Sequence, residues 1–383
     1  MTRLLLTGAG GFAGAHFLEH ALATTDWDIV ATDSFRHRGT TDRISQVLDG
    51  GPPQWPYRVD VITHDLTAPF SPQAEHQIAG KHGLDYIIAM ASLSHVDTSL
   101  SEPAAFIENN VAVALSSLEL ARRLNPRALV LISTDEVYGP VGLQPGCETC
   151  GLEAESPGQF RCAKHSAHAE WSTLLPSNPY SASKAAQESI SISYWRTYGI
   201  PLIITNTMNL VGERQHPEKM VPKTLRAVLA GEEAVIHGSP GHVGTRHYLH
   251  ARNMADAILF LLKTTVPSVY SGRWIMDQAG TSYRAEVKGR PFASPADRPD
   301  RYNVASPDRI DNLTLASMIA DAAGKPLHWR FEDFHTTRPG HDAHYGLDPA
   351  KIHALGWKAP VPFDESLQRT VRWTMAHPEW MLD

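Results

Sequence analysis

A tyrosine and a lysine on one predicted helix are the side chains best suited to move protons. Tyr180 and Lys184 are four residues apart in the segment YSASK, so both face the same side of a helix. A lysine ammonium beside a phenol lowers the pKa of that phenol, which allows the tyrosine to act as a base near neutral pH. The lysine can also bind the ribose of a nicotinamide cofactor. The pair is a candidate catalytic base, although the spacing alone is common.

Two adjacent carboxylates stand at the end of a predicted strand. The segment STDEVYG places Thr134, Asp135 and Glu136 at the end of the apolar run 128–134. Continuous apolar runs are typical of strands buried in a parallel sheet, and ligands bind at the carboxyl ends of such strands. Adjacent carboxylates are useful there if one donates a proton and the other accepts one. The alternative interpretation is a polar turn that ends the strand.

A glycine-rich segment near the N-terminus predicts a dinucleotide site. TGAGGFAG places Gly8, Gly11 and Gly14 between a predicted strand and a predicted helix. Glycines at these positions allow the backbone to approach a pyrophosphate at the helix N-terminus. Asp33 ends the next strand, and an acidic residue there binds ribose hydroxyls and disfavours a 2′-phosphate. We therefore expect NAD rather than NADP, while FRHR at 35–38 is the feature that could accommodate a phosphate.

The elements that must position these residues alternate along the first half of the chain. Strand-type runs at 3–8, 28–33, 86–92, 128–134 and 201–207 are interleaved with helical patterns at 11–23, 103–124 and 180–199. This alternation predicts an α/β fold with a Rossmann-type doubly wound parallel sheet. Helical patterns at 219–230, 252–263, 312–323 and 364–377 then predict a smaller C-terminal α/β substrate lobe. The predicted domains are 1–207 and 208–383, with insertions at 141–178 and about 272–300.

Composition and charge are those of an ordinary globular protein. The 383 residues are 42% hydrophobic and 20% charged, and the longest apolar runs are too short to cross a bilayer. The formal net charge of −7 argues against general nucleic-acid binding. The N-terminus shows no signal-peptide pattern, so we expect a cytoplasmic protein without a membrane partner.

All three cysteines lie in the first insertion. Cys147 and Cys150 are followed, after eleven residues, by Cys162 and then by His165. This spacing predicts a structural zinc site with three cysteine ligands and one histidine, with His168 as an alternative fourth ligand. A metal would stabilise an insertion that has few apolar residues of its own. Inert thiols and a redox disulfide are the alternative interpretations.

The chain resembles the extended short-chain dehydrogenase/reductases, and among them the dTDP-glucose 4,6-dehydratases of the NAD-dependent epimerase/dehydratase family. The segments that match this pattern are TGAGGFAG, SHVDTS, FIENNV, STDEVYG, NPYSASKA, HPEKMVP, RPGHDAHY and LGW. Asp135 followed by Glu136 is the specific part, because epimerases of the superfamily usually lack both carboxylates and nucleotide-sugar decarboxylases tend to have Ser-Glu. The resemblance implies a homodimer formed through helices 103–124 and 180–198, and a tightly bound NAD that is regenerated in each cycle.

The resemblance also implies a role for each catalytic residue. Tyr180 would take the proton of the hydroxyl on sugar carbon 4, to which Thr134 would hydrogen-bond. Glu136 would remove the proton on carbon 5, and a protonated Asp135 would donate to the hydroxyl that leaves carbon 6. The substrate would be a nucleotide sugar and the product its 4-keto-6-deoxy derivative.

Two sets of binding residues complete this interpretation. We expect NAD to contact Gly8, Gly11, Phe12, Gly14, Asp33, Asp65, Leu66, Tyr180 and Lys184. We expect the nucleotide sugar to contact Ser94, His95, Asn209, Lys219, Arg246, Asn303 and Arg338. Leu93, Glu213 and His247 stand where the family usually has Glu, Pro and Asp. These departures surround the sugar and the nucleotide, so the base and the hexose stay open.

Two other functions are weighed against the dehydratase. A 4-epimerase or decarboxylase of the same superfamily is disfavoured because Asp135 and Glu136 are both present. A non-catalytic NAD-binding scaffold protein, in which zinc would organise an interaction surface, would need neither carboxylate.

Overall fold

The computed structural model describes residues 2–141, 167–239, 242–265, 274–276, 282–284, 297–307, 309–332 and 345–382. The chain passes several times between two units. Unit 1 comprises Met1–Ser133, Pro179–Thr205 and Ile258–Tyr302, and unit 2 comprises Thr134–Asn178, Asn206–Ala257 and Asn303–Asp383. The domain boundary predicted near residue 207 lies beside the crossing between Thr205 and Asn206.

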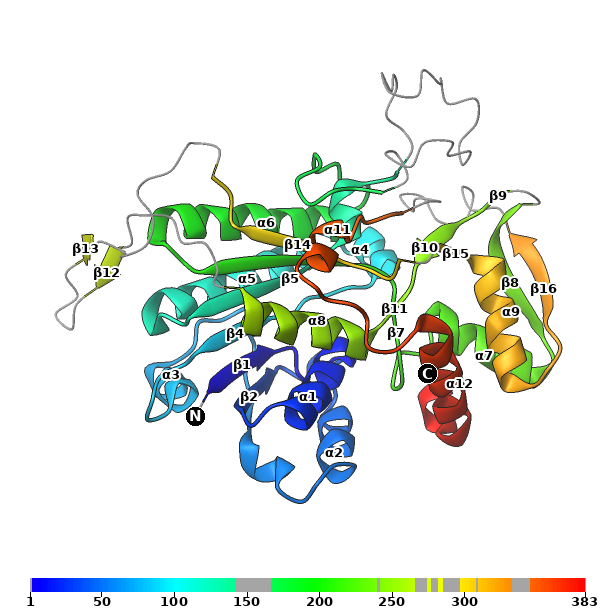
Figure 1. The fold of residues 1–383 in the computed structure, drawn as a ribbon, viewed down its shortest axis with the longest axis horizontal. Helices are drawn as coiled ribbons and strands as arrows, with labels where there is room; N and C mark the ends of the chain where they lie inside the picture. Colours follow the sequence, from blue (N-terminus) through cyan, green and yellow to red (C-terminus); the bar gives the residue numbers. More distant parts are fainter. Residues whose placement is uncertain are drawn as a thin grey trace. The chain divides into compact units, whose positions relative to one another are not determined.

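A seven-stranded sheet forms the centre of unit 1 (Figure 1). Its strand order is β14-β6-β5-β4-β1-β2-β3, and the pairings of β1 with β2 and β4, of β2 with β3, and of β4 with β5 are parallel. The strands are β1 (Arg3–Thr7), β2 (Asp28–Asp33), β3 (Val59–Thr63), β4 (Tyr86–Ala89), β5 (Ala128–Thr134), β6 (Leu202–Thr207) and β14 (Asp300–Val304). The order of β1 to β6 is that of a Rossmann-type doubly wound fold, which confirms the predicted fold class.

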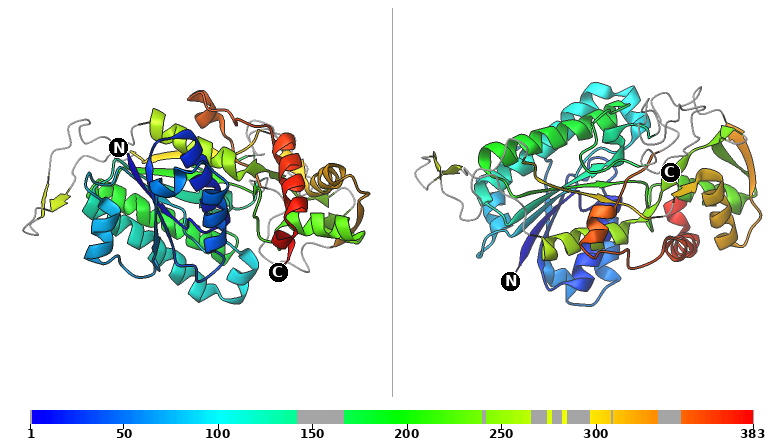
Figure 2. Two further views of the ribbon diagram at one scale, coloured as in Figure 1. Left: turned by 90° about the horizontal axis from the view of Figure 1, so that it is seen from below. Right: turned by 45° about the horizontal axis from the view of Figure 1, so that its top comes forward.

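Helices cover both faces of this sheet (Figures 1 and 2). One face carries α1 (Phe12–Thr24) and α2 (Thr41–Asp49), and the other carries α3 (Pro72–Ala79), α5 (Pro103–Leu124) and α6 (Pro179–Tyr198). The short helices α4 (Val96–Ser101) and η1 (Trp55–Arg58) lie in connections. Every residue of β5 is buried, since helices cover both of its faces, and this explains why its sequence is a continuous apolar run.

Unit 2 is built from small sheets and helices. Its sheets are β16-β8-β9, β10-β15 and β11-β7. The elements are η2 (Asp135–Tyr138), β7 (Leu210–Val211), α7 (Met220–Ala230), β8 (Glu233–Ser239), β9 (His242–Val243), β10 (Thr245–His247), β11 (Leu249–His250), β15 (Arg309–Asp311), α9 (Asn312–Ala323), β16 (His328–Glu332), α11 (Ala350–Ala354), α12 (Phe363–Ala376) and η4 (Pro378–Met381). Apolar side chains of α7, α9 and α12, including Leu225, Leu315 and Leu367, form one buried cluster.

Three further elements complete the description. Helix α8 (Ala251–Thr264) begins in unit 2 and continues into unit 1. Strands β12 (Trp274–Met276) and β13 (Ser282–Arg284) form an antiparallel pair within the second predicted insertion. Among the described helices, none combines the length and the apolar character needed to cross a membrane.

Candidate active site

The segment from the end of β1 to the first turn of α1 leaves no room for a Cβ at several of its glycines. Gly8 adopts φ +72°, a conformation that favours glycine, and a Cβ there would lie 2.8 Å from Ala91 Cα. A Cβ on Gly14 would overlap the carbonyl oxygen of Gly8, so a side chain at this position would push α1 away from the turn. The first amides of α1, which begins at Phe12, therefore stay close to the turn. Such a cradle suits a dinucleotide pyrophosphate.

Asp33 at the end of β2 is oriented by two backbone amides. Its Oδ2 accepts from Gly10 N and its Oδ1 from Phe35 N, each at 3.0 Å. A carboxylate has about four lone-pair sites, so this one can still accept hydrogen bonds from ribose hydroxyls. A Cβ on Gly39 would lie 2.6 Å from Asp33 Oδ1, which shows how closely the following loop approaches the carboxylate. The surroundings of Asp33 thus suit an unphosphorylated ribose.

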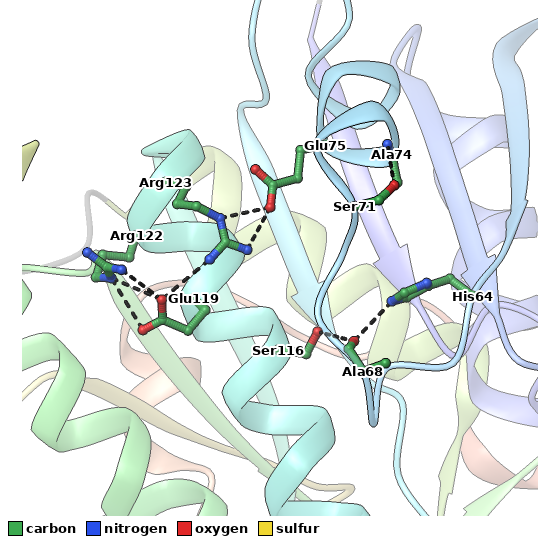
Figure 3. A network of polar contacts seen from close by, with 9 residues as sticks. All are labelled: His64, Ala68, Ser71, Ala74, Glu75, Ser116, Glu119, Arg122 and Arg123. Atoms are coloured by element: carbon green, nitrogen blue, oxygen red, sulfur yellow. Dashed lines mark hydrogen bonds and ion pairs between the residues drawn. The ribbon is translucent and has the colours of Figure 1, made fainter. Parts of the chain in front are cut away.

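The loop after β3 carries Asp65 and Leu66, and α5 helps to fix it. His64 Nε2 and Ser116 Oγ donate to the carbonyl oxygen of Ala68 at 3.1 and 3.3 Å (Figure 3). Leu66 is buried. Asp65 Oδ2 lies 2.5 Å from Arg36 Nη1. Arg36 belongs to the FRHR segment, and a carboxylate occupies it here, which favours NAD over NADP.

One ion pair joins the two helices beside this loop, and two more lie within α5. Arg123 of α5 pairs with Glu75 of α3 at 2.7 Å, and Glu119 pairs with Arg122 and Arg123 (Figure 3). Exposed pairs of this kind contribute little stability individually. The Arg123–Glu75 pair links α3 to α5.

Helix α6 places Tyr180 and Lys184 on one face. Lys184 is buried, and its Nζ donates to Ile132 O and to Gln187 Oε1, each at 2.7 Å. Burial lowers the pKa of Lys184 to about 8, although the charge of Glu188 opposes this shift. The Tyr180 amide donates to Ser99 Oγ at 3.2 Å. Because Ile132 precedes Thr134 by two residues on β5, Lys184 is anchored to the strand that leads to the two carboxylates.

Thr134, Asp135 and Glu136 form a second group, at the start of unit 2. Thr134 Oγ1 donates to Asp135 Oδ1 at 2.9 Å and accepts from Glu136 N at 3.3 Å. Glu136 Oε2 accepts from Asn178 Nδ2 at 3.1 Å. Asn206 Nδ2 donates to the carbonyl oxygen of Thr134 at 2.9 Å and so fixes the backbone of this turn.

The two carboxylates have different environments. Asp135 is 4% exposed. Burial and then the charge of Glu136 raise the pKa of Asp135 from 3.8 to about 7, against the opposing effects of Thr134 and Arg246. Glu136 is half-buried and hydrogen-bonded to an amide. Near neutral pH Asp135 is therefore partly protonated, and the pair offers a proton donor beside a second carboxylate.

The residues expected to bind substrate are distributed over both units. In unit 1, Ser94 is exposed, and His95 Nδ1 accepts from Thr98 N at 3.2 Å, which caps α4. In unit 2, Asn209 adopts φ +41°, and Lys219 precedes the first residue of α7. Their roles in substrate binding stay predictions.

The remaining substrate-binding predictions fall on buried residues or outside the described chain. The Arg246 guanidinium lies 4.5 Å from the centre of the Tyr345 ring and is buried. Asn303 is fully buried, and its Nδ2 donates to the carbonyl oxygens of His168 and Asp348 at 2.8 and 3.1 Å. These bonds hold separate segments of unit 2 together. Arg338 lies outside the described residues.

The predicted zinc ligands Cys147, Cys150, Cys162 and His165 also lie outside the described residues. The alternative ligand His168 is described. Its Nε2 donates to Gly139 O at 3.2 Å, and its ring stacks on Tyr138 with centroids 5.2 Å apart. The zinc site stays a prediction.

Sequence reasoning missed the amides that support the catalytic side chains. Asn110 is fully buried in α5, and it accepts from Leu93 N at 2.8 Å and donates to Ser183 Oγ at 2.8 Å. It thereby joins the loop after β4 to α6. A signal was available, because Asn110 is a polar residue on the apolar face of the FIENNV segment.

The chain matches a known protein family. Residues 4–271 match the model of the NAD dependent epimerase/dehydratase family. The chain belongs to this family. It is 28% identical over 394 residues to dTDP-glucose 4,6-dehydratase 1 of Escherichia coli (strain K12), covering 99% of this chain and 94% of the relative.

Solved structures agree on the fold. DesIV, a dTDP-glucose 4,6-dehydratase from Streptomyces venezuelae determined with NAD bound, is 25% identical, with a TM-score of 0.73 over 99% of this chain and 98% of that one. UDP-glucuronic acid 4-epimerase from Bacillus cereus is 18% identical, with a TM-score of 0.74 over 98% of this chain and all of that one (100%). The second likeness concerns the fold alone.

Proposed function

We propose that the protein is an NAD-dependent nucleotide-sugar 4,6-dehydratase, which converts an NDP-hexose into the NDP-4-keto-6-deoxyhexose and water. The observation that carries the proposal is the buried Asp135, with its pKa raised to about 7, beside Glu136. Elimination of water needs an acid for the leaving hydroxyl and a base for the proton on the neighbouring carbon. A 4-epimerisation breaks no bond at carbon 5 or 6 and needs neither.

The glycine cradle and Asp33 would hold the cofactor. Gly8, Gly11 and Gly14 would admit the pyrophosphate, Asp33 would bind the adenosine ribose, and Lys184 would bind the nicotinamide ribose. When bound, NAD would accept a hydride from sugar carbon 4 and supply it to carbon 6, so that it leaves the cycle unchanged.

The protein's side chains would carry out the proton transfers. Tyr180 takes the proton of the carbon 4 hydroxyl, to which Thr134 hydrogen-bonds, and the Lys184 ammonium stabilises the phenolate. The new ketone makes the proton on carbon 5 acidic, and Glu136 removes it. Asp135 protonates the hydroxyl that leaves carbon 6, which gives water. Glu136 then returns a proton to carbon 5, and solvent transfers the proton of Tyr180 back to Asp135.

Chain connectivity supports joint action of the two groups. Thr134 directly follows Ser133 of β5, the strand to which Lys184 is anchored. Asn178, which bonds Glu136, is separated from Tyr180 by Pro179 alone.

A homodimer is also proposed. On α5, Ile107, Val111 and Leu115 are half-buried apolar residues at four-residue spacing, which suits contact with a second helix layer.

A panel incubation tests the proposal. The purified protein would be incubated with dTDP-, UDP-, CDP- and GDP-hexoses without added reductant, and the products analysed by mass spectrometry. Loss of one water from one member of the panel would support the dehydratase and identify the nucleotide base of the substrate. The same loss should not occur with Tyr180→Phe. Isomerisation without a change of mass would indicate an epimerase and contradict the proposal.

A further inference from the structure

The Lys184 ammonium has two of its three N–H donors engaged within unit 1. One bond goes to Ile132 O of β5 and the other to Gln187 Oε1, each at 2.7 Å. Lys184 and Gln187 are three residues apart on α6, so they share one helix face. Both are buried, at 4% and 1% exposure. An ammonium has three donors, so one stays available to a bound ligand.

The Gln187 amide is itself fixed. Its Nε2 donates to the backbone carbonyl oxygen of Asn110 on α5 at 2.6 Å. An ammonium can only donate and a carbonyl can only accept, so these two partners determine which end of the amide faces the lysine. Asn110 is held in turn by Ser183. The acceptor presented to Lys184 is therefore rigid.

The charges around the Lys184 ammonium explain why the acceptor Gln187 Oε1 is important. The buried carboxylate of Glu188, on the same helix, raises the pKa of Lys184, but Glu188 is paired with the buried Arg301 of β14, which balances its charge. The two partners of the Lys184 ammonium, Ile132 O on β5 and Gln187 Oε1 on α6, are uncharged carbonyl oxygens. Tyr180 is the titratable group one turn before the lysine. Gln187 Oε1 thus supplies polar stabilisation that a buried ammonium needs. With its pKa lowered to about 8, Lys184 has little margin before it loses its charge at neutral pH.

We propose that Gln187 is a positioning residue of the catalytic pair, which keeps the Lys184 ammonium charged and directed so that Tyr180 can release its proton near neutral pH. This inference rests on the proposed function, in which Tyr180 is the base. Removing the acceptor makes the lysine neutral at lower pH, and the phenol then loses the neighbouring positive charge. The pKa of Tyr180 should rise as a result.

The test compares Gln187→Met, which keeps the length of the side chain and removes both polar atoms, with the matched control Ser191→Ala. Ser191 is fully buried on the same helix and has no hydrogen-bond partner among the described residues. Tyrosines labelled at the ring carbon that bears the oxygen would be titrated by NMR in the NAD-bound protein, with Tyr180→Phe assigning the signal. We expect the Tyr180 pKa to rise by about one unit in Gln187→Met and to stay unchanged in the control. Turnover below this pKa should fall about tenfold, with the acid limb of its pH profile moved by the same amount.

An unchanged Tyr180 titration in folded Gln187→Met would overturn the inference. Thermal unfolding establishes that each variant is folded, and Gln187→Leu replaces the methionine variant if that one is not. The titration needs no sugar substrate. Absence of turnover with every nucleotide sugar would therefore count against the proposed function, while the NMR result would still decide the role of Gln187.

Discussion

Asparagine at position 135 should stabilise the protein at alkaline pH while it blocks the elimination. The Asp135→Asn side chain keeps the oxygen that accepts from Thr134 Oγ1 at 2.9 Å. It cannot ionise, however, and it cannot act as an acid. The wild-type carboxylate must be ionised at high pH although it is buried and lies beside Glu136.

The size of the effect follows from the shifted pKa. In the folded protein, burial and then Glu136 raise the pKa of Asp135 from 3.8 to about 7. The folded state therefore binds this proton more tightly than the unfolded state does. The resulting stabilisation is complete below pH 3.8 and is lost as the pH rises through about 7. A shift of about three units, at about 1.4 kcal/mol each, corresponds to about 4 kcal/mol.

Urea unfolding of the two proteins, from about pH 4 to about pH 8, measures this difference. Wild type and Asp135→Asn should be nearly equal at the acid end, and the variant should be more stable at the alkaline end by up to the amount above. Glu136→Gln provides a matched control, because removing its charge should reduce the pH dependence and leave Asp135 ionisable. A stability difference between wild type and Asp135→Asn that stays constant with pH would refute the reasoning.

The same variant should separate the steps of the reaction. Tyr180 and Lys184 are untouched in Asp135→Asn, so oxidation at carbon 4 should still occur and absorbance of the reduced cofactor should appear when substrate is added. Loss of the acid should slow overall turnover by about 10²- to 10⁴-fold. Turnover at the wild-type rate would remove Asp135 from the mechanism.

Three further predictions concern the base, the cofactor cradle and the metal. Tyr180→Phe should lower turnover by at least about 10²-fold while the purified protein still contains NAD, and turnover at the wild-type rate would contradict its assignment as the base. Gly14→Ala should weaken NAD affinity, measured by calorimetry, by about tenfold or more, because the new Cβ would overlap Gly8 O, and normal affinity would argue against the cradle. Protein purified without chelator should contain zinc by elemental analysis and lose it in Cys147→Ser, whereas a zinc-free wild type with a normally folded variant would exclude the site.

The elements of unit 1 could be predicted where burial requires a clear apolar pattern in the sequence. The predicted bounds of β2, α5 and β5 match the structure, because these are apolar strands or a long helix that begins at a proline. The strand predicted at 86–92 is wrong at its end, since β4 stops at Ala89. The amides of Met90 and Ala91 instead donate to Thr7 Oγ1 at 3.0 and 3.1 Å, a contact that no local pattern shows.

The catalytic residues could be predicted from the sequence, whereas the residues that orient them could not. The sequence singled out Tyr180 and Asp135 because their residue types and neighbours suit proton transfer. The contacts that orient their partners join distant segments: Asn178 bonds Glu136, 42 positions away, and Gln187, which accepts from Lys184, is itself held by Asn110, 77 positions away. The raised pKa of Asp135 likewise depends on burial in the folded chain, which spacing along the sequence does not reveal.

The central claim is most directly tested with a nucleotide hexose that carries deuterium on carbon 4, chosen as the panel member that reacts. In a 4,6-dehydration the hydride removed from carbon 4 is delivered to carbon 6. We therefore expect a product that has lost one water and carries the deuterium on carbon 6. Deuterium found on carbon 4 of an isomer of unchanged mass would show that the hydride returns to its origin, and would contradict the dehydratase.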